Sequence, residues 1–272
     1  MRSYLPGSDA PFGQEIFAVI QNTVLEVAKG QLGGRRLLEV EGPYGLGHKS
    51  FGLMDRPVGE QAQVGGAVAR LKSAPTVPIP LLEATFELGI REVAGYEQGQ
   101  APFDLEPAVM AAIAMARAED LLVFQGNDQL GLKGITNYPG VQSLGLGDWN
   151  VMGQPVEDII KAVGMLEAKS LLGPYALALS PANYDVLFRR DQEAAMLQLQ
   201  HLREIVTAGI VKSPALSAGG VLVAAGRPFA SIVLGQDLTL GFVGPKDTGY
   251  ELVIYESLAT RVSVPDAVVV LT

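Results

Sequence analysis

The sequence contains no cysteine and only two histidines, His48 and His201. The absence of cysteine excludes disulfides, thiolate metal sites and cysteine nucleophiles, and two histidines without a carboxylate at ligand spacing exclude a histidine-rich metal site. We therefore expect neither a metal nor a cofactor. No apolar run reaches the roughly 18 residues that span a membrane, and the first residues lack the apolar core of a secretion signal. The predicted location is the cytoplasm, without a membrane partner.

Charged residues are also scarce, at 18% of 272 residues with a net charge of −9. A sequence-independent nucleic-acid surface needs clustered lysine and arginine, whereas Arg35-Arg36 and Arg189-Arg190 are isolated pairs. No nucleic-acid partner is therefore expected. Hydrophobic residues, by contrast, make up 48% of the chain. Two explanations fit this apolar excess equally well: a surface that other subunits cover, or the large core of an enzyme.

Motifs for nucleotide binding and catalysis are incomplete. Residues 42–50 resemble a phosphate-binding loop, but His48 separates Gly47 from Lys49, and this spacing moves the lysine away from the phosphates. No Gly-x-Ser-x-Gly nucleophile elbow is present. Glu39 and Glu41 lie two residues apart, and such a pair can serve acid–base catalysis, but a polar strand edge or a contact between subunits explains it better. We therefore predict that the protein is not an enzyme.

Hydrophobic periodicity predicts a mixture of helices and strands. Apolar residues recur every four positions from Phe12 to Ala28, which predicts an amphipathic helix that Gly30 and Gly33-Gly34 end. An alanine-rich segment from Pro107 to Val123, apolar on most faces, predicts a buried helix. The pattern further predicts helices over 155–171, 181–188 and 194–208, and strands over 82–88, 175–179, 220–225, 230–243 and 251–271. Because these elements follow no regular strand–helix–strand repeat, we expect an α+β fold.

Residues 45–80 are rich in glycine and proline and show no strong periodicity. A structureless stretch of this length is uncommon inside a compact domain. It is either a mobile loop or an arm whose partners belong to another subunit.

Two sequence motifs resemble one protein family, the encapsulins, which are shell proteins built on the tailed-phage capsid fold. The first consists of Gly34-Arg35 followed by Val40-Glu41-Gly42-Pro43-Tyr44-Gly45, and the second is Leu234-Gly235-Gln236-Asp237-Leu238. The strand around Phe86, the alanine-rich helix, Gly134-Ile135 and Gly173-Pro174-Tyr175 also occur in the family's order. The resemblance thus extends over nearly the whole chain.

The resemblance implies a tailed-phage capsid-like fold in three parts. A peripheral domain would comprise residues 1–46 with the N-terminal helix, 81–134 with the alanine-rich spine helix, and the strands of 228–272. An extended loop, residues 47–80, would cross to a neighbouring subunit. An axial domain, residues 135–227, would meet its copies at the five-fold axis. The extended loop would then find strand partners for its backbone groups in another chain.

The resemblance also implies a function: a self-assembling encapsulin nanocompartment whose icosahedral shell, with roughly 60 copies favoured, encloses a cargo enzyme. The cargo would be a protein such as a dye-decolourising peroxidase or a ferritin-like protein, in iron storage or oxidative stress. Its C-terminal targeting peptide would dock on the inner wall, between the N-terminal helix and the peripheral strands. At the matching positions this groove would contain Val24, Ala28, Arg35, Glu39, Asp237, Leu238 and Leu240. Arg35 and Asp237 would pair with cargo charges, whereas for Val24 and Ala28 sealing the helix against the sheet is an equal alternative.

Pores in such a shell would pass small ions or substrates. The five-fold pore would lie at Asp191, Gln192 and Glu193, where carboxylates favour cations over anions. Some relatives bind flavin through an aromatic residue after the Phe86-type strand, and Ile90-Arg91 at that place predicts no flavin. Two alternatives remain: a tailed-phage or prophage major capsid protein, and a soluble α+β enzyme with an unrecognised site.

Overall fold

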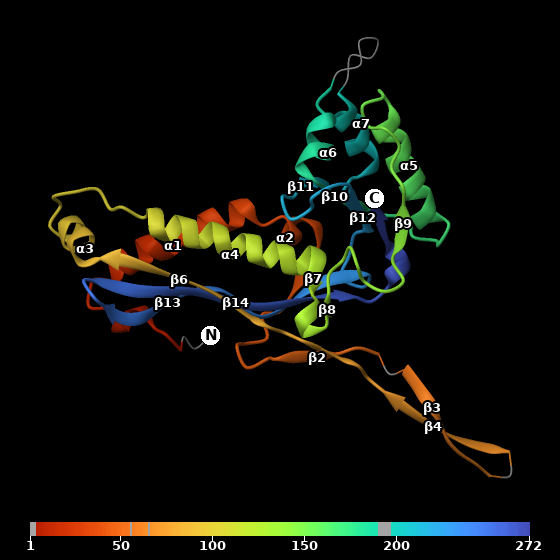
Figure 1. Cartoon of the computed structure of the whole chain (residues 1–272), viewed down its shortest axis with the longest axis horizontal. Coiled ribbons are helices and arrows are strands. Elements are labelled where there is room, and N and C mark those ends of the chain that lie inside the picture. The colour runs from red at the N-terminus through yellow and green to blue at the C-terminus, as the bar shows by residue number, and fades with distance from the viewer. Residues whose placement is uncertain (1–3, 55, 65, 190–196) are drawn as a thin grey trace.

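The computed structural model describes residues 4–54, 56–64, 66–189 and 197–272. Figure 1 shows an elongated body, an upright lobe at one end of that body, and a narrow arm that projects from it. Helices and strands contribute to both the body and the lobe. The predicted α+β fold is confirmed.

The body is built on a four-stranded sheet in the order β1 (Glu39–Glu41), β13 (Ala230–Lys246), β14 (Gly249–Val262) and β6 (Leu81–Gly89). Helices α1 (Gln14–Gln31) and α4 (Glu106–Gln125) lie side by side over one face of this sheet (Figure 1). Their buried residues form one core with the strands, as the period of four predicted. This core includes Ile16, Ile20, Ala112, Met115, Phe86, Leu252 and Ile254.

One detail of the body differs from the sequence prediction, and one agrees with it. Residues Ile90–Glu97 form a further helix, α3, directly after β6, where no helix was expected. Helix α4 begins at Glu106, whose backbone N–H donates to the Asp104 carboxylate at 2.9 Å, and Pro107 occupies its first turn. Proline is tolerated there because the first backbone N–H groups of a helix have no intrahelical partner.

The upright lobe holds a five-stranded sheet in the order β11 (Gly209–Lys212), β10 (Tyr175–Leu179), β12 (Gly220–Ala224), β15 (Val268–Leu271) and β9 (Gln142–Leu144). Helices α5 (Gln154–Glu167), α6 (Pro181–Val186) and α7 (Gln198–Ile205) pack around it. Strand β15 corrects the expectation of one continuous run over 251–271. A turn at Pro265–Ala267 separates it from β14, so the end of segment 228–272 crosses from the body into the lobe.

The arm is paired within its own chain. Strand β2 (Ser50–Gly52) pairs with β5 (Thr76–Pro78), and β3 (Arg56–Val64) pairs with β4 (Ala67–Ser73) in an antiparallel hairpin. The expectation that these residues find their strand partners only in another chain is therefore wrong. The sequence did not reveal the hairpin because β4 alternates between apolar and polar residues only over residues 69–72 and β3 shows no regular alternation, whereas a strand with one buried face alternates throughout.

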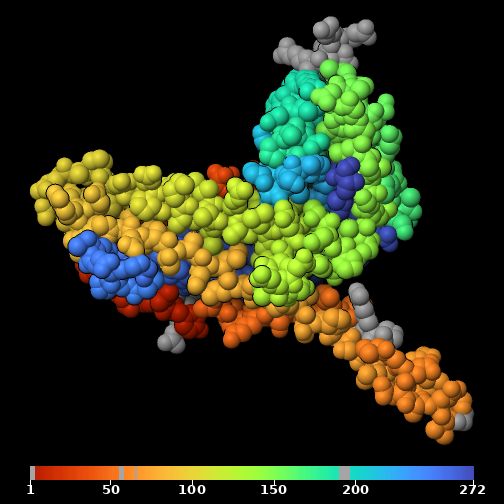
Figure 2. All heavy atoms as spheres, in the orientation of Figure 1, coloured from red at the N-terminus to blue at the C-terminus, as the bar shows by residue number. Residues whose placement is uncertain are grey.

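A third cluster of buried residues joins the three parts of the molecule. It contains the C-terminal end of α4, residues of both sheets, and Phe51 and Ile79 at the root of the arm. The short strands β7 (Gly126–Asn127) and β8 (Leu132–Lys133) turn the chain from α4 towards the lobe. Figure 2 shows that the hairpin itself stands clear of the rest of the molecule.

Candidate functional site

The two signature motifs lie side by side. Strand β1 runs parallel to β13, with Glu39 opposite Ser231 and Glu41 opposite Val233. The chain then continues along β13, where the Tyr44 backbone N–H donates to the Leu234 carbonyl at 3.0 Å. Gly42 has φ of +110°, and a Cβ atom there would lie 2.6 Å from the Leu234 oxygen. Only glycine fits this close approach, so the motifs form one structural unit.

The Gly33–Leu37 corner, in which the short helix α2 (Gly34–Leu37) follows Gly33, is held against the spine helix. The Asp120 carboxylate of α4 accepts hydrogen bonds from the Gly33 N–H at 2.9 Å and the Gly34 N–H at 2.8 Å. A Cβ atom on Gly34 would lie 3.0 Å from Val123 Cγ1. Helix α1 already ends at Gln31. These glycines therefore permit close docking on α4, rather than serving only to end α1.

Arg35 is the centre of a cluster of charged residues, which we call the Arg35 cluster and which contains Glu119, Asp237 and Glu256. The guanidinium donates from Nε and Nη2 to the two oxygens of Glu119, at 2.8 and 2.9 Å. It also donates to Asp237 Oδ1 at 2.7 Å and to Glu256 Oε2 at 2.8 Å. The side chains of Glu119 and Glu256 are fully buried, whereas that of Asp237 is 51% exposed. Three carboxylates thus share one cation.

The electrostatics of the Arg35 cluster follow from its burial. Burial opposes the charge on Arg35, but hydrogen bonds to Glu119 and Asp237 and the nearby negative charges outweigh it and raise the arginine pKa. For Glu256, burial and then the Glu119 charge raise the carboxyl pKa, and Arg35 only partly offsets them. In the part of the chain that the structure describes, Glu256 Oε1 is buried without a hydrogen-bond partner. The cluster therefore favours a proton on Glu256.

Glu39 and Glu41 do not form a carboxylate pair. Glu41 is buried, accepts a hydrogen bond from the Ser231 hydroxyl and pairs with Arg261 Nη1 at 2.7 Å. The Arg261 guanidinium lies 4.6 Å from the centre of the Phe51 ring at the root of the arm. Glu39, in contrast, is exposed. The two glutamates therefore cannot act together as acid and base, and Glu41 has a structural role.

The residues predicted to line the cargo groove fall into three groups. Val24, Ala28 and Leu240 are 1%, 1% and 4% exposed, and they seal α1 against the sheet. Arg35 and Asp237 pair with each other rather than being free for another charge. Leu238 is half-buried against the same core.

Glu39 follows Arg35 by four residues but lies far along the sheet from Leu238. It pairs with Ser231, seven positions along β13 from Leu238, which corresponds to about 20 Å of extended strand. The predicted pore residues Asp191, Gln192 and Glu193 lie outside the described residues. The helices that flank them in sequence, α6 and α7, belong to the upright lobe (Figure 1).

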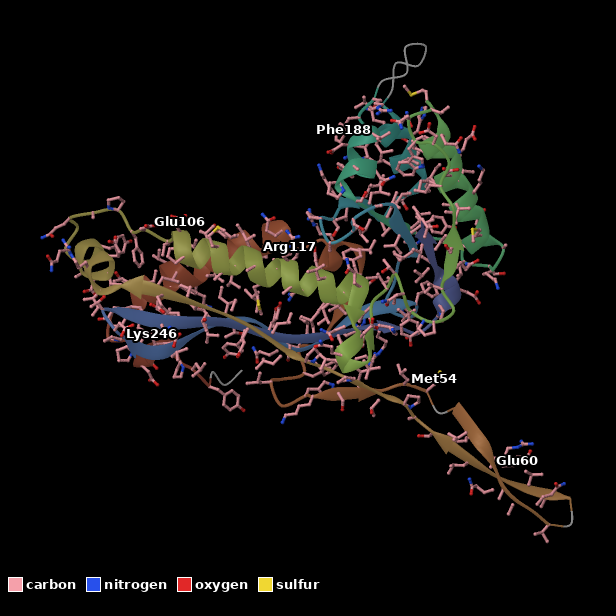
Figure 3. The ribbon with its side chains drawn as sticks, in the orientation of Figure 1. Met54, Glu60, Glu106, Arg117, Phe188 and Lys246 are labelled. Carbon is pink, nitrogen blue, oxygen red and sulfur yellow. The ribbon has the colours of Figure 1, made fainter. Side chains whose placement is uncertain are left out.

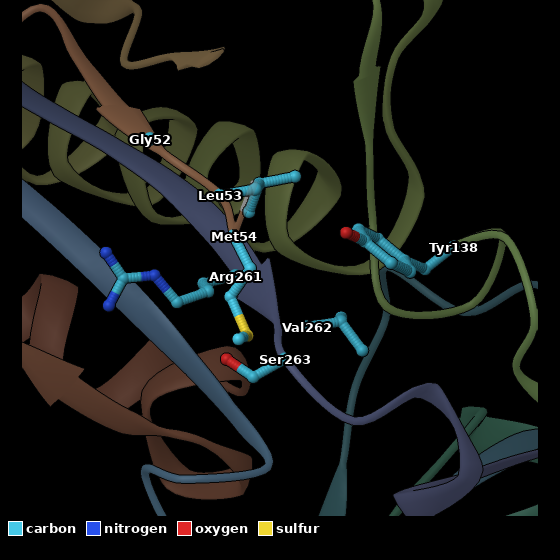
Figure 4. Close-up of a pocket in the computed structure, with 7 residues that line it drawn as sticks. All are labelled: Gly52, Leu53, Met54, Tyr138, Arg261, Val262 and Ser263. Atoms are coloured by element: carbon cyan, nitrogen blue, oxygen red, sulfur yellow. The ribbon is translucent and has the colours of Figure 1, made fainter. Parts of the chain in front are cut away.

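A hollow at the root of the arm was not predicted from the sequence. It has a volume of about 400 Å³ and is lined by Gly52, Leu53, Met54, Tyr138, Arg261, Val262 and Ser263 (Figure 4). A second hollow of about 280 Å³ shares Leu53 and Tyr138 with it and continues to Pro75 and Pro139. The lining comes from the arm, from the turn after β8 and from β14. These three segments come together only in the folded chain, so no local sequence pattern could reveal the hollow.

Neither a metal centre nor a membrane segment emerges from the described residues. No group of three or more potential ligands among them could hold a metal ion. Of the helices in the described ranges, none combines the length and the apolarity needed to cross a membrane.

Comparison with known proteins gives a consistent result. Residues 1–259 match the model of the family described as "Encapsulating protein for peroxidase". The chain is 30% identical to the type 1 encapsulin shell protein EncA of Myxococcus xanthus (strain DK1622), over 98% of this chain and 96% of that protein. It is 26% identical to a type 1 encapsulin shell protein of Rhodospirillum rubrum, over 96% of this chain and 93% of that protein.

Solved structures show the same fold. The virus-like particle protein of Pyrococcus furiosus superposes with a TM-score of 0.73 at 23% identity, over 95% of this chain and 100% of that one. The capsid protein of Myoviridae phage XM1 superposes with a TM-score of 0.60 at 17% identity, over 88% and 90% of the two chains. The latter likeness concerns the fold alone and confirms the predicted capsid-like architecture. Since the family model and the M. xanthus relative both extend over nearly the whole sequence, the chain belongs to the encapsulin shell proteins, a family of structural rather than catalytic proteins.

Proposed function

We propose that this shell protein closes into an icosahedral particle of roughly 60 copies, and that its arm makes the contact between subunits. The projection of the arm carries the proposal. Two-stranded hairpins are marginally stable in water, and the Arg70–Glu60 pair, whose closest atoms are 3.9 Å apart, is exposed on both sides. Figure 3 shows Met54 at the root of the arm, and Glu60 on the hairpin, clear of the body.

The surface of the arm fits an assembly contact. Val58, Val64 and Leu71 are 63%, 79% and 45% exposed, so the described residues of their own chain leave much of each side chain uncovered. The hollows beside Leu53 and Tyr138, at the other end of the arm, have walls that are partly apolar. A repeated contact between the arm of one copy and the body of the next is heterologous, and it generates a closed particle when its rotation closes.

The assembly is tested by expressing the protein alone and examining it by negative-stain electron microscopy. Uniform hollow spheres are the expected result. A monomer or a small ring would contradict the proposed assembly.

The second part of the proposal concerns cargo. A targeting peptide at the C-terminus of a cargo enzyme, such as a dye-decolourising peroxidase or a ferritin-like protein, would dock beside α1 and β13. The half-buried Leu238 and the partly exposed Arg35–Asp237 pair support this location, because an apolar side chain beside a charged pair suits a short amphipathic peptide. Val24, Ala28 and Leu240 would form the buried floor of the groove. Glu39 would contact the peptide only if the peptide is bound in an extended conformation.

The docking site is tested with a fluorescent protein that carries the last residues of a peroxidase or ferritin-like protein encoded beside this gene. It should copurify with wild-type shells and be lost from Leu238→Asp shells. Val243→Asp is the matched control, since Val243 lies on the same strand and is 48% exposed. Equal retention by both variants would place the docking site elsewhere.

We further propose that Asp191, Gln192 and Glu193 line a five-fold pore through which small ions or substrates pass. A ring of carboxylates would favour cations, which would suit iron storage. Shells with Asp191→Asn and Glu193→Gln should then take up Fe²⁺ more slowly than wild-type shells. An unchanged rate would contradict the pore assignment.

The particle is proposed to be a cytoplasmic nanocompartment rather than a phage head. The match of residues 1–259 to the encapsulating-protein family supports this choice, whereas the likeness to phage capsids concerns the fold. Purified particles free of DNA are expected, and packaged DNA would favour the alternative of a phage or prophage capsid.

A further inference from the structure

One edge of strand β13 has no strand beside it along the second half of its length. Strand β1 pairs with this edge only from Ser231 to Val233, while β14 pairs with the opposite edge. From Gln236 to Lys246, no other strand of the described residues adjoins the first edge. Such an open edge presents main-chain N–H and C=O groups that can pair with another extended segment.

The N-terminal segment of the same chain covers a part of this open edge. The Leu5 carbonyl accepts a hydrogen bond from the Phe242 N–H at 3.3 Å. Because alternate residues of a strand direct their main-chain groups to the same edge, those of Leu240 face the open edge as well. Residues 4–6 belong to no helix or strand, and among the described residues this is the one main-chain hydrogen bond that joins them to β13.

The Leu5 side chain packs directly on Gly241. Leu240 and Phe242 are buried in the core with α1 and α4, so Gly241 between them faces the other side of the sheet. A Cβ atom on Gly241 would lie 2.7 Å from Leu5 Cβ. The leucine therefore lies against the glycine backbone, and a larger residue at position 241 would exclude it.

The segment can leave the edge without disturbing the body. Gly7 is fixed to α1, because its carbonyl accepts from Gln14 Nε2 at 2.9 Å and it lies close against the Phe17 ring. Tyr4 and Leu5, in contrast, are 63% and 36% exposed. Only the residues before Gly7 need to move for the edge to open.

We propose that residues 4–6, which we call the plug, close a peptide-binding edge, and that the targeting peptide of the cargo displaces them. The peptide pairs with the main chain of Leu240 and Phe242 as an added strand and places an apolar side chain over Gly241, where Leu5 lies now. This inference rests on the proposed docking of cargo beside α1 and β13. Leu238, which that docking uses, lies two residues before Leu240 on the same strand, so one extended peptide reaches both.

The chemistry of the ligand follows from this mode of binding. Strand addition supplies affinity through main-chain hydrogen bonds and specificity through alternate side chains. The ligand is therefore an extended peptide with a leucine or a similar apolar residue at the position of Leu5. In a subunit without cargo, the plug covers an edge that would otherwise pair with other chains.

The test uses a fluorescent protein that ends in the sequence of residues 4–10 and is produced together with the shell protein. Leu5→Asp in the shell protein removes the apolar contact of the plug. This variant should retain about ten times more of the probe than the wild type does, because a larger fraction of its edges is open. A probe that itself carries Leu5→Asp should be retained by neither. Equal retention of the first probe by both shell proteins would overturn the proposal.

A second substitution tests the contact with Gly241. The methyl group of Gly241→Ala leaves no room for a leucine on the strand, so the double variant Leu5→Asp/Gly241→Ala should lose the probe. Leu5→Asp/Val243→Ala is the matched control, since Val243 is 48% exposed on the same strand, and it should keep the probe. Circular dichroism establishes that both double variants are folded. Retention of the probe by the folded Gly241→Ala double variant would overturn the proposal.

The cargo probe of the docking experiment separates the plug from the docking site. Leu5→Asp shells should retain more of that probe than wild-type shells, whereas Leu238→Asp shells lose it. Loss from Leu238→Asp without a gain in Leu5→Asp would overturn the plug and leave the docking site in place. Equal retention by wild-type and Leu238→Asp shells would contradict the docking site and the plug with it.

Discussion

The arm and the Gly33–Leu37 corner lie close together in the sequence but differ in what holds them. The corner is fastened by hydrogen bonds from Gly33 and Gly34 to a buried carboxylate and by the four-element Arg35 cluster. The hairpin of the arm has an exposed ion pair and apolar side chains open to solvent. The corner is held by contacts within one chain, whereas we propose that a second copy covers the arm. Substitutions should therefore affect folding at the corner and assembly at the arm.

The largest effect on folding is expected from Arg35→Met. It leaves Glu119 and Glu256 buried without their cation, and breaking a buried pair costs about 3–5 kcal/mol. Chemical denaturation followed by circular dichroism measures the loss. Arg36→Met is the control, because Arg36 is exposed and the one hydrogen bond of its side chain among the described residues is its donation to the Leu32 carbonyl at 2.9 Å. This substitution should cost less than about 1.5 kcal/mol. Equal losses in the two variants would contradict the importance of the cluster.

Gly34→Ala should have the next largest effect. Its methyl group would lie 3.0 Å from Val123 Cγ1, and such overpacking costs about 1–3 kcal/mol. Gly30→Ala provides the contrast, because a methyl group there meets nothing within 4 Å. Within α1 it should stabilise the protein by about 0.5–1 kcal/mol. The same denaturation experiment measures both changes in the free energy of unfolding. An unchanged value for Gly34→Ala would show that the corner tolerates looser docking on α4.

Leu71→Asp should change folding least but remove assembly. Leu71 is exposed on the hairpin, so the free energy of unfolding of the subunit should change by no more than about 0.5 kcal/mol. The buried charge would nevertheless disrupt a contact with a neighbouring copy. Gln63→Asp places the same charge on the same hairpin without removing an apolar side chain, and it should still assemble. Size-exclusion chromatography and circular dichroism separate the two outcomes. Intact Leu71→Asp particles would exclude this face of the arm from the contact.

The sequence predicted those helices whose apolar residues recur with a regular spacing or fill most of the segment. The recurrence of apolar residues from Phe12 to Ala28 gave α1, and the alanine-rich segment gave α4. It also assigned Arg35 and Asp237 to one cargo groove, through the resemblance rather than through spacing. Pairing within the arm and the transfer of β15 to the lobe depend on distant partners, such as Val270 opposite Val221, and no local pattern contains them.

The Arg35 cluster is a second feature that the sequence predicted only in part. The sequence suggested that Arg35 and Asp237 meet cargo charges, but it gave no sign of Glu119 or Glu256. Glu119 and its neighbour Asp120 are buried acids near the end of a mostly apolar helix. An acid at such a buried position signals an unseen partner, and that signal could have been read.

The most direct test of the central claim is mass photometry of the wild-type protein beside the Leu71→Asp variant. With 28.7 kDa per chain, roughly 60 copies give about 1.7 MDa. We expect a single wild-type population near this mass, and a variant that remains at the mass of free or few subunits. A wild-type protein of only a few copies, or a variant of unchanged mass, would contradict assembly through the arm.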